Sequence, residues 1–199
     1  MYHHKNNIWL RKLEREDLTD LKELKNENWW GVHNTLIIND DDQLKWYNNI
    51  SDKDLFMMVM HEETKLGIVS YTNIHHINRS CHVSGSGFKS ATKAGMAENS
   101  WHCCIDFAYE ILNLLRTEAE VLSFNTPAQK RNIETIGMKV EGVRRQAVYK
   151  SGKYYDSILL GLLRSEWENH ERVKSYGGSC NKDFDHKKAE KLILRSKYI

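Results

Sequence analysis

Residues 80–124 pass from a strand through a loop and a helix to a second strand, and this order constrains the fold most. Residues 80–88 (SCHVSGSGF) and 119–124 (AEVLSF) are typical of strands. Between them, apolar residues recur at helical spacing: Trp101, Ile105, Ala108, Leu112 and Leu115. The segment therefore predicts a β-α-β unit, in which the two strands are parallel and the crossover is right-handed.

The remaining elements follow in a mixed order. Further strands are predicted at residues 8–13, 54–61, 66–74, 138–149 and 154–163, the last two joined by a hairpin turn at 150–153. Helices are predicted at residues 17–24, from the acidic run Asp40–Asp42 onward, and between Pro127 and Gly137. This order predicts an α/β (α+β) domain that spans residues 8–167.

Composition excludes several classes of protein. The net charge is +2 and no apolar run approaches the roughly 20 residues of a membrane helix, so we expect neither a membrane nor a nucleic acid as a partner. The N-terminal segment lacks the apolar stretch of a secretory signal, which favours a cytoplasmic protein. Residues 168–199 hold eight Lys/Arg against five Asp/Glu and are expected to form a basic C-terminal extension.

The cysteines and histidines do not form a recognisable metal motif. The four cysteines include an adjacent pair, Cys103 and Cys104, which would be poor disulfide partners, and no C-x-x-C pair exists. The ten histidines match no usual ligand spacing. We therefore expect free thiols and no metal.

The loop before the long helix, TKAGMAENSW (residues 92–101), lies where a phosphate-binding loop would. A helix N-terminus presents unpaired N–H groups and a positive dipole to an anion, and Gly95 would allow close approach of the backbone. One glycine is a weak signal, however. From the residues alone, the segment is either a reduced phosphate loop or an ordinary helix start.

Three segments together resemble the GNAT superfamily of N-acetyltransferases, over about residues 8–167. In the first, SCHVSGSGFKSATKAGMAENSW, Gly95 and Ala97 match the last two positions of the family signature Arg/Gln-x-x-Gly-x-Gly/Ala, whereas Thr92 departs from it. The second is NTPAQKRNIETIGMKVEGVRR. The third, GKYYDSILLGLLRSEW, is similar to the closing strand of ribosomal-protein alanine and amino-sugar acetyltransferases.

This resemblance implies a GNAT-like mixed central sheet with a β-α-β core that binds acetyl-CoA and is flanked by helices. The implied reaction takes place in a ternary complex, in which a primary amine attacks acetyl-CoA directly. The amine belongs to an amino sugar or to a protein N-terminus. The acceptor is then a small molecule or a peptide, and the protein a monomer or homodimer. The residues implied to contact coenzyme A are Ser86, Gly87, Phe88, Lys93, Ala94, Gly95, Met96, Ala97, Glu98, Asn125 and Asn132.

The resemblance implies two candidates for the catalytic base. His82 stands where many family members carry Glu, which makes it the first candidate base, and Glu141 is the second. The family's frequent Tyr acid is missing, because Ile133 lies close to its position. Trp29, Trp30 and His33 are expected to line the acceptor pocket, although aromatic residues there would also suit helix-to-sheet packing.

The departures at Thr92, His82 and Ile133 also fit a second hypothesis. In it, the chain is a catalytically silent GNAT-fold protein that binds coenzyme A or a partner as a sensor. The two hypotheses differ in whether any amine is acetylated.

Overall fold

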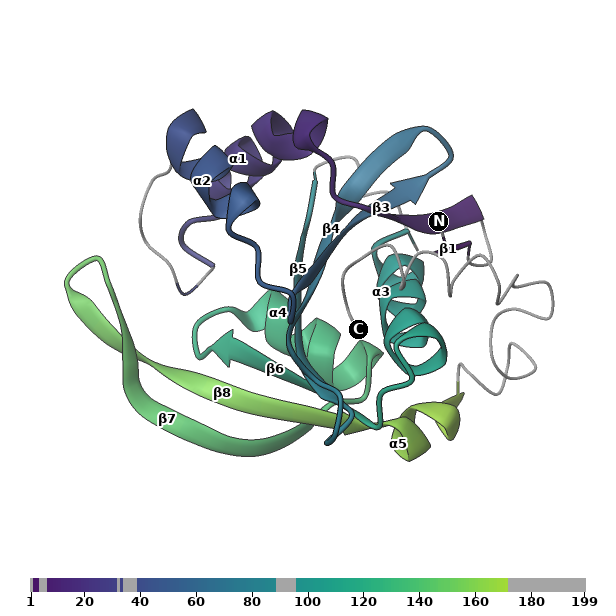
Figure 1. Ribbon diagram of the computed structural model, residues 1–199. Helices are drawn as coiled ribbons and strands as arrows, with labels where there is room; N and C mark the ends of the chain where they lie inside the picture. Colours follow the sequence, from purple (N-terminus) through teal and green to yellow (C-terminus); the bar gives the residue numbers. More distant parts are fainter. Residues whose placement is uncertain (1, 4–6, 32, 34–38, 89–95, 172–199) are drawn as a thin grey trace. The chain divides into compact units, whose positions relative to one another are not determined.

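The computed structural model describes residues 2–3, 7–31, 33, 39–88 and 96–171 (Figure 1). The chain forms two compact units. The first unit comprises Met1–Leu13, Ser51–Thr117 and Leu163–Ile199, and the second comprises Glu14–Ile50 and Glu118–Leu162. Within the described residues, no helix has the length and apolar character needed to cross a membrane.

The first unit is built on an antiparallel sheet. Its strands pair in chain order: β1 (Tyr2–His3), β2 (Ile8–Lys12), β3 (Leu55–His61), β4 (Thr64–His75) and β5 (Ser80–Gly87). Two helices follow in the chain, α3 (Met96–Asp106) and the short α5 (Arg164–Glu168). The strands expected from the alternating and apolar runs are therefore confirmed.

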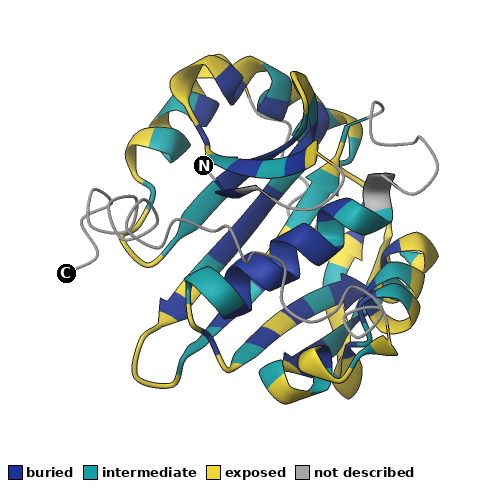
Figure 2. Ribbon diagram, turned by 90° about the vertical axis from the view of Figure 1, so that its right-hand side faces the viewer, coloured by how far each residue is buried: buried dark blue, intermediate teal, exposed yellow. Residues whose placement is uncertain are grey.

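Helix α3 packs on one face of this sheet. The Tyr71 hydroxyl of β4 donates to the Cys104 carbonyl at 2.8 Å, and Trp101 lies against Gly85 of β5, whose missing side chain leaves room for the indole. Cys103, Cys104 and Ile105 are buried (Figure 2). Of the apolar face that the sequence assigns to this helix, Ile105 and Ala108 are buried in the core of the first unit.

The end of this helix differs from the prediction, which extended it to Leu115. A π turn, Phe107–Ile111, follows α3, and Asn113 has a left-handed φ of 52° that ends the helix. Leu114 is consequently buried, whereas Leu115 is 46% exposed. Strand β6 begins at Arg116, three residues earlier than expected.

The second unit combines a helical pair with a long hairpin. It contains α1 (Leu18–Glu27), α2 (Asp40–Asn48), most of β6 (Arg116–Leu122), α4 (Thr126–Lys130), β7 (Lys139–Lys150) and β8 (Lys153–Leu163). The strands lie in the order β6-β8-β7, with β7 and β8 antiparallel. The mixed α/β class expected from the sequence is therefore confirmed.

Lys25 joins α1 to α2 and is expected to make stability depend on pH. Its Nζ lies 3.7 Å from the centroid of the Trp46 ring and 3.4 Å from Gln43 Oε1. Burial lowers the pKa of Lys25 from 10.5 to about 8, so the folded chain binds this proton less tightly than the unfolded chain. The wild-type free energy of unfolding should therefore rise as pH increases from about 8 to about 10.5.

Substituting Lys25→Met should reveal this effect. At pH 7 we expect the variant to be more stable by about 1 kcal/mol, after discounting for partial solvent screening and for the lost cation–π contact. The advantage should vanish by pH 10, as measured by urea unfolding. Lys22→Met is the control, because Lys22 pairs with exposed Asp40 on the same helical pair. A Lys25→Met advantage that does not change with pH would contradict the prediction.

Candidate active site

The predicted coenzyme loop lies partly outside the described residues. Lys93, Ala94 and Gly95 belong to this part, so their role stays a prediction. The helix start expected after the loop is observed, since the backbone of α3 begins at Met96, followed by Ala97. Glu98 lies half-buried in the first turn. A helix that begins here suits the pyrophosphate-binding role that the resemblance implies.

The end of β5 has main-chain groups suited to an extended ligand. Gly87 lies opposite Gly67 of β4, and the N–H of Phe88 donates to the Leu66 carbonyl at 2.8 Å. In an antiparallel pair, the main-chain N–H and C=O groups of successive residues point alternately toward and away from the partner strand. Those of Ser86 and Phe88 point toward β4, so the N–H and C=O of Gly87 point away from it. Gly87 is also exposed. This geometry is compatible with pairing to the pantetheine arm.

The two candidate bases fall in different units. His82 is half-buried on β5, where its carbonyl accepts from the Thr72 hydroxyl at 3.4 Å. Its neighbour Val83 lies opposite Tyr71, on the α3 side, so His82 lies on the other sheet face. Glu141 is exposed in a β-bulge of β7 in the second unit. Their catalytic roles stay predictions.

The two asparagines expected to contact coenzyme A have structural contacts. Asn125 caps α4, since its Oδ1 accepts from the Ala128 N–H at 3.3 Å, and its Nδ2 donates to the Gly31 carbonyl at 3.2 Å. Asn132 is 4% exposed, and its Oδ1 accepts from Arg131 Nε at 3.3 Å. Contact of either residue with the coenzyme stays a prediction.

In the second unit, the residues predicted for the acceptor pocket lie in one cluster. Trp29 and Trp30 are 40% and 44% exposed, and the Trp30 ring lies 6.4 Å from that of Phe124. Phe124 in turn makes an edge contact with Tyr155 at 4.6 Å. We call the Trp–Glu cluster the following residues: Trp29, Trp30, His33, Glu120, Phe124, Arg144, Lys150, Tyr155 and Ser157.

The turn that carries the tryptophans is held by two side chains. Lys150 is 4% exposed, and its Nζ donates to the Trp29 carbonyl at 2.6 Å and lies 5.6 Å from the Trp29 ring centroid. Asn125 holds the Gly31 carbonyl two residues later. Burial lowers the pKa of Lys150. The two contacts fix the position of the aromatic surface.

One ring nitrogen of His33 lies close to both a carboxylate and a hydroxyl. Its Nε2 lies 3.1 Å from Ser157 Oγ and 3.5 Å from Glu120 Oε1. Burial lowers the pKa of His33, and Lys150 and Arg144 lower it further, whereas Glu120 acts in the opposite direction. His33 is therefore a neutral imidazole at pH 7.

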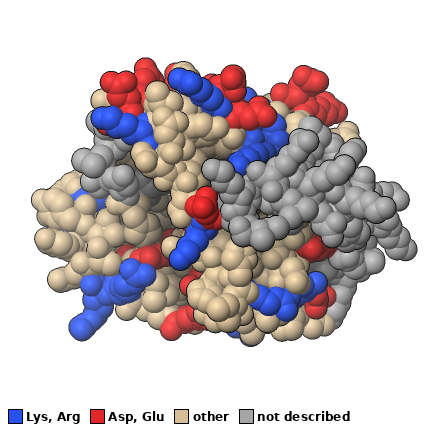
Figure 3. Space-filling model, viewed as in Figure 1, with Lys and Arg blue, Asp and Glu red and all other residues tan. Residues whose placement is uncertain are grey.

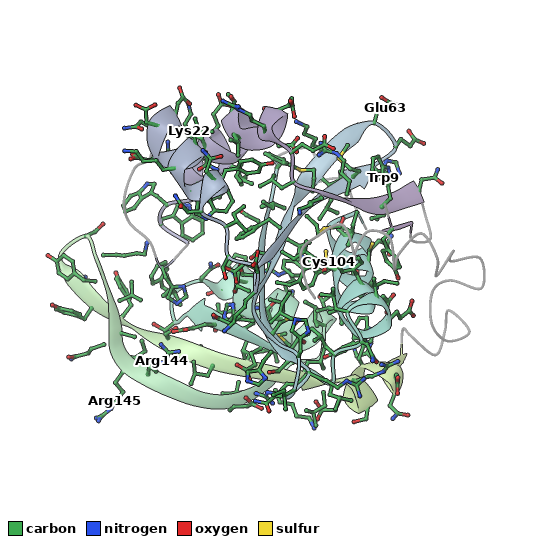
Figure 4. The ribbon with its side chains drawn as sticks, in the orientation of Figure 1. Trp9, Lys22, Glu63, Cys104, Arg144 and Arg145 are labelled. Atoms are coloured by element: carbon green, nitrogen blue, oxygen red, sulfur yellow. The ribbon has the colours of Figure 1, made fainter. Side chains whose placement is uncertain are left out.

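Arg144 of β7 lies opposite Ser157 of β8, directly before a bulge, and reaches Glu120. The register with β8 shifts after Arg144, where Gln146 has a φ of 53° and its N–H donates to Asp156 Oδ1 at 2.8 Å. Arg144 and Arg145 leave β7 on opposite sides (Figure 4). Arg144 Nη2 donates to Glu120 Oε2 at 2.9 Å, so Glu120 is shared between Arg144 and His33.

Sequence reasoning missed Glu120, Ser157, Lys150 and Arg144. Glu120 lies between the buried residues Ala119 and Val121, so alternation along the strand places it on the polar face. Nothing in the sequence separates it from Glu118, however. Among the described residues, no group of three or more His, Cys, Asp or Glu is arranged to hold a metal ion.

The comparisons with known proteins agree with this architecture. The family model for the acetyltransferase (GNAT) domain matches residues 7–139. The uncharacterized N-acetyltransferase YokL, derived from the SPbeta prophage of Bacillus subtilis, is 25% identical over 82% of this chain and 94% of its own length. YdaF of the same organism, provisionally named a ribosomal N-acetyltransferase, is 25% identical over 57% of this chain and 61% of its own.

The fold is also that of a solved acetyltransferase. Spermidine N-acetyltransferase from Vibrio cholerae, in complex with CoA and spermine, is 23% identical, covers 81% of this chain and 98% of its own, and has a TM-score of 0.73. The resemblance read from the three sequence segments is thereby confirmed. The chain belongs to the GNAT acetyltransferase family and is an N-acetyltransferase that uses acetyl-CoA as its co-substrate.

Proposed function

We propose that the acceptor is a small aliphatic polyamine, acetylated on a primary amine. The observation that carries the proposal is the pair of exposed tryptophans, Trp29 and Trp30, which share a unit with the acidic helices α1 and α2. Indole faces and carboxylates both attract alkylammonium groups. An amine acceptor with several cationic nitrogens matches this combination.

The charge of the helical segment supports the same acceptor. Residues 14–50 contain nine Asp/Glu and four Lys/Arg, a net charge of −5 in a chain whose total is +2. Figure 3 shows acidic side chains on the part of the surface where α1 and α2 lie in Figure 1. An acidic surface raises the local concentration of a polycation. The spermidine acetyltransferase of similar fold is compatible with this choice.

The reaction follows from the family chemistry. The amine nitrogen attacks the thioester carbonyl carbon, the C–N bond forms, and the C–S bond breaks with a proton passing to the thiolate. We propose that the main-chain N–H of Gly87, which points away from β4, stabilises the oxyanion as the coenzyme arm pairs with the end of β5, because the N–H of Phe88 already donates to Leu66. His82, and after it Glu141, are the bases proposed from the sequence.

An acceptor panel tests the proposal. Purified protein would first be melted with and without acetyl-CoA, because a ligand that binds the folded state raises Tm. It would then be incubated with acetyl-CoA and one of three acceptors: spermidine, glucosamine, or a peptide with N-terminal alanine. The products would be identified by mass spectrometry. We expect a Tm increase and acetylated spermidine.

The other outcomes identify the alternatives. Acetylation of glucosamine or of the peptide alone would reject the polyamine and favour the acceptors implied by the sequence resemblance. A rise in Tm without any acetylated amine would favour the coenzyme-binding sensor.

A further inference from the structure

His33 has the surroundings of a proton acceptor rather than those of a packing residue. Its side chain is 42% exposed, while that of Glu120 is only 15% exposed. Its Nε2 faces Glu120 Oε1 and Ser157 Oγ, so the proton of the neutral ring is favoured on Nε2 by the carboxylate. Nδ1 then carries the lone pair on the other side of the ring.

We propose that His33 accepts the proton of the acceptor amine, with Glu120 as the positioning residue that fixes its tautomer and orientation. The inference rests on the amine acceptor of the proposed function, although not on the acceptor being a polyamine. It assigns to His33 a role that was predicted from the sequence for His82 or Glu141. An imidazole held by a carboxylate through one nitrogen is well suited to accept a proton at the other.

The charges around His33 favour the unprotonated form that this role needs. Glu120 faces it from β6, Arg144 and Lys150 from β7, and Ser157 from β8. The two cations oppose protonation, while Glu120 is partly neutralised by its ion pair with Arg144. His33 therefore enters the reaction as a base, and it becomes an imidazolium only when it has taken a proton.

The proton balance is complete without another reactant. The amine loses one proton to Nδ1 of His33 as the C–N bond to the acetyl carbon forms. The thiolate released by C–S cleavage then takes a proton from the imidazolium or from water, which restores neutral His33 and leaves the amide and coenzyme A.

The first test is the pH dependence of kcat/KM with whichever amine the wild type acetylates. His33→Gln should lower kcat/KM by about 10²-fold and remove the acidic limb of the profile. His76→Gln, an exposed histidine of the first unit, is the matched control and should leave both unchanged. If His33→Gln retains the limb and His82→Gln removes it, the proposal is overturned in favour of His82.

The second test separates Glu120 from a merely structural residue and needs no acceptor. Glu120→Gln removes the carboxylate that raises the pKa of His33, so the NMR titration of the His33 ring should move to lower pH. With an amine present, the acidic limb should shift the same way and kcat/KM should fall by about tenfold. An unchanged His33 titration would overturn the assignment of Glu120, even if no acceptor had been found.

Discussion

Replacing Gly67 by Ala is expected to lower the free energy of unfolding by about 3 kcal/mol, because the new methyl group has no room. A Cβ built at Gly67 would lie 2.4 Å from the Ser86 carbonyl oxygen and 2.9 Å from Gly87 Cα. Both neighbours are backbone atoms of β5, so only a separation of the strands relieves the clash. For a chain of this size, the loss corresponds to a Tm decrease of about 6–12 °C.

The same variant should also bind acetyl-CoA more weakly. The clash acts on Ser86 and Gly87, which are the residues proposed to pair with the pantetheine arm. The Tm increase on adding acetyl-CoA should therefore be smaller in Gly67→Ala than in the wild type.

Gly142→Ala is the matched control for stability. A Cβ at Gly142 would meet only Leu159 Cδ1 at 3.7 Å, an ordinary contact, so Tm should change by no more than about 2 °C. If Gly67→Ala melts within the same margin as Gly142→Ala, β4 and β5 adapt to the methyl group and the predicted close approach is wrong.

The strands of this protein could be predicted because their signals are local. Apolar and alternating runs placed β3, β4 and β5 within one or two residues of their observed bounds. The β7–β8 turn was expected over residues 150–153 and narrows to Ser151 and Gly152, whose φ values of 47° and 84° suit a two-residue hairpin. Gly152 is the residue from which this turn could be predicted.

The end of α3 could not be predicted from periodicity. Leu112 and Leu115 continue the helical spacing, but the π turn after α3 shifts the face that the helix buries, and Asn113 ends the helix before Leu115 is reached. A residue in the left-handed region is a feature of the backbone. Asn113 tolerates it, yet its presence in the sequence does not require it.

The residues of the candidate site also divide into those that could be predicted from the sequence and those that could not. Trp29, Trp30 and His33 could be singled out because the family resemblance implies that the acceptor pocket lies in this N-terminal region. Glu120, Arg144 and Lys150 could not, since each is a common surface residue type. Their roles depend on long-range pairing, such as the contact between Lys150 and Trp29 across 121 residues and the pairing of Arg144 with Ser157 of β8.

Lys150→Met is expected to raise the KM for the acceptor about tenfold while leaving the affinity for acetyl-CoA unchanged. The substitution keeps the apolar stem packed but removes the donor to the Trp29 carbonyl, so the Trp29–Gly31 turn loses the hydrogen bond from Lys150 and keeps the one from Asn125. The unpaired carbonyl costs about 1–3 kcal/mol, and the removal of a buried ammonium offsets part of that cost.

The pH dependence of stability separates the cost of the unpaired Trp29 carbonyl from the gain of removing the buried ammonium. Because burial lowers the pKa of Lys150, the unfolded chain holds this proton more tightly, and the ammonium destabilises the folded chain most at neutral pH. Lys150→Met should therefore lose stability relative to the wild type as pH rises toward the unfolded pKa of Lys. Lys153→Met, at the exposed position opposite Lys150 in the hairpin, is the control and should change neither KM nor this pH profile. An unchanged acceptor KM in Lys150→Met would mean that the turn keeps its position without the hydrogen bond from Lys150.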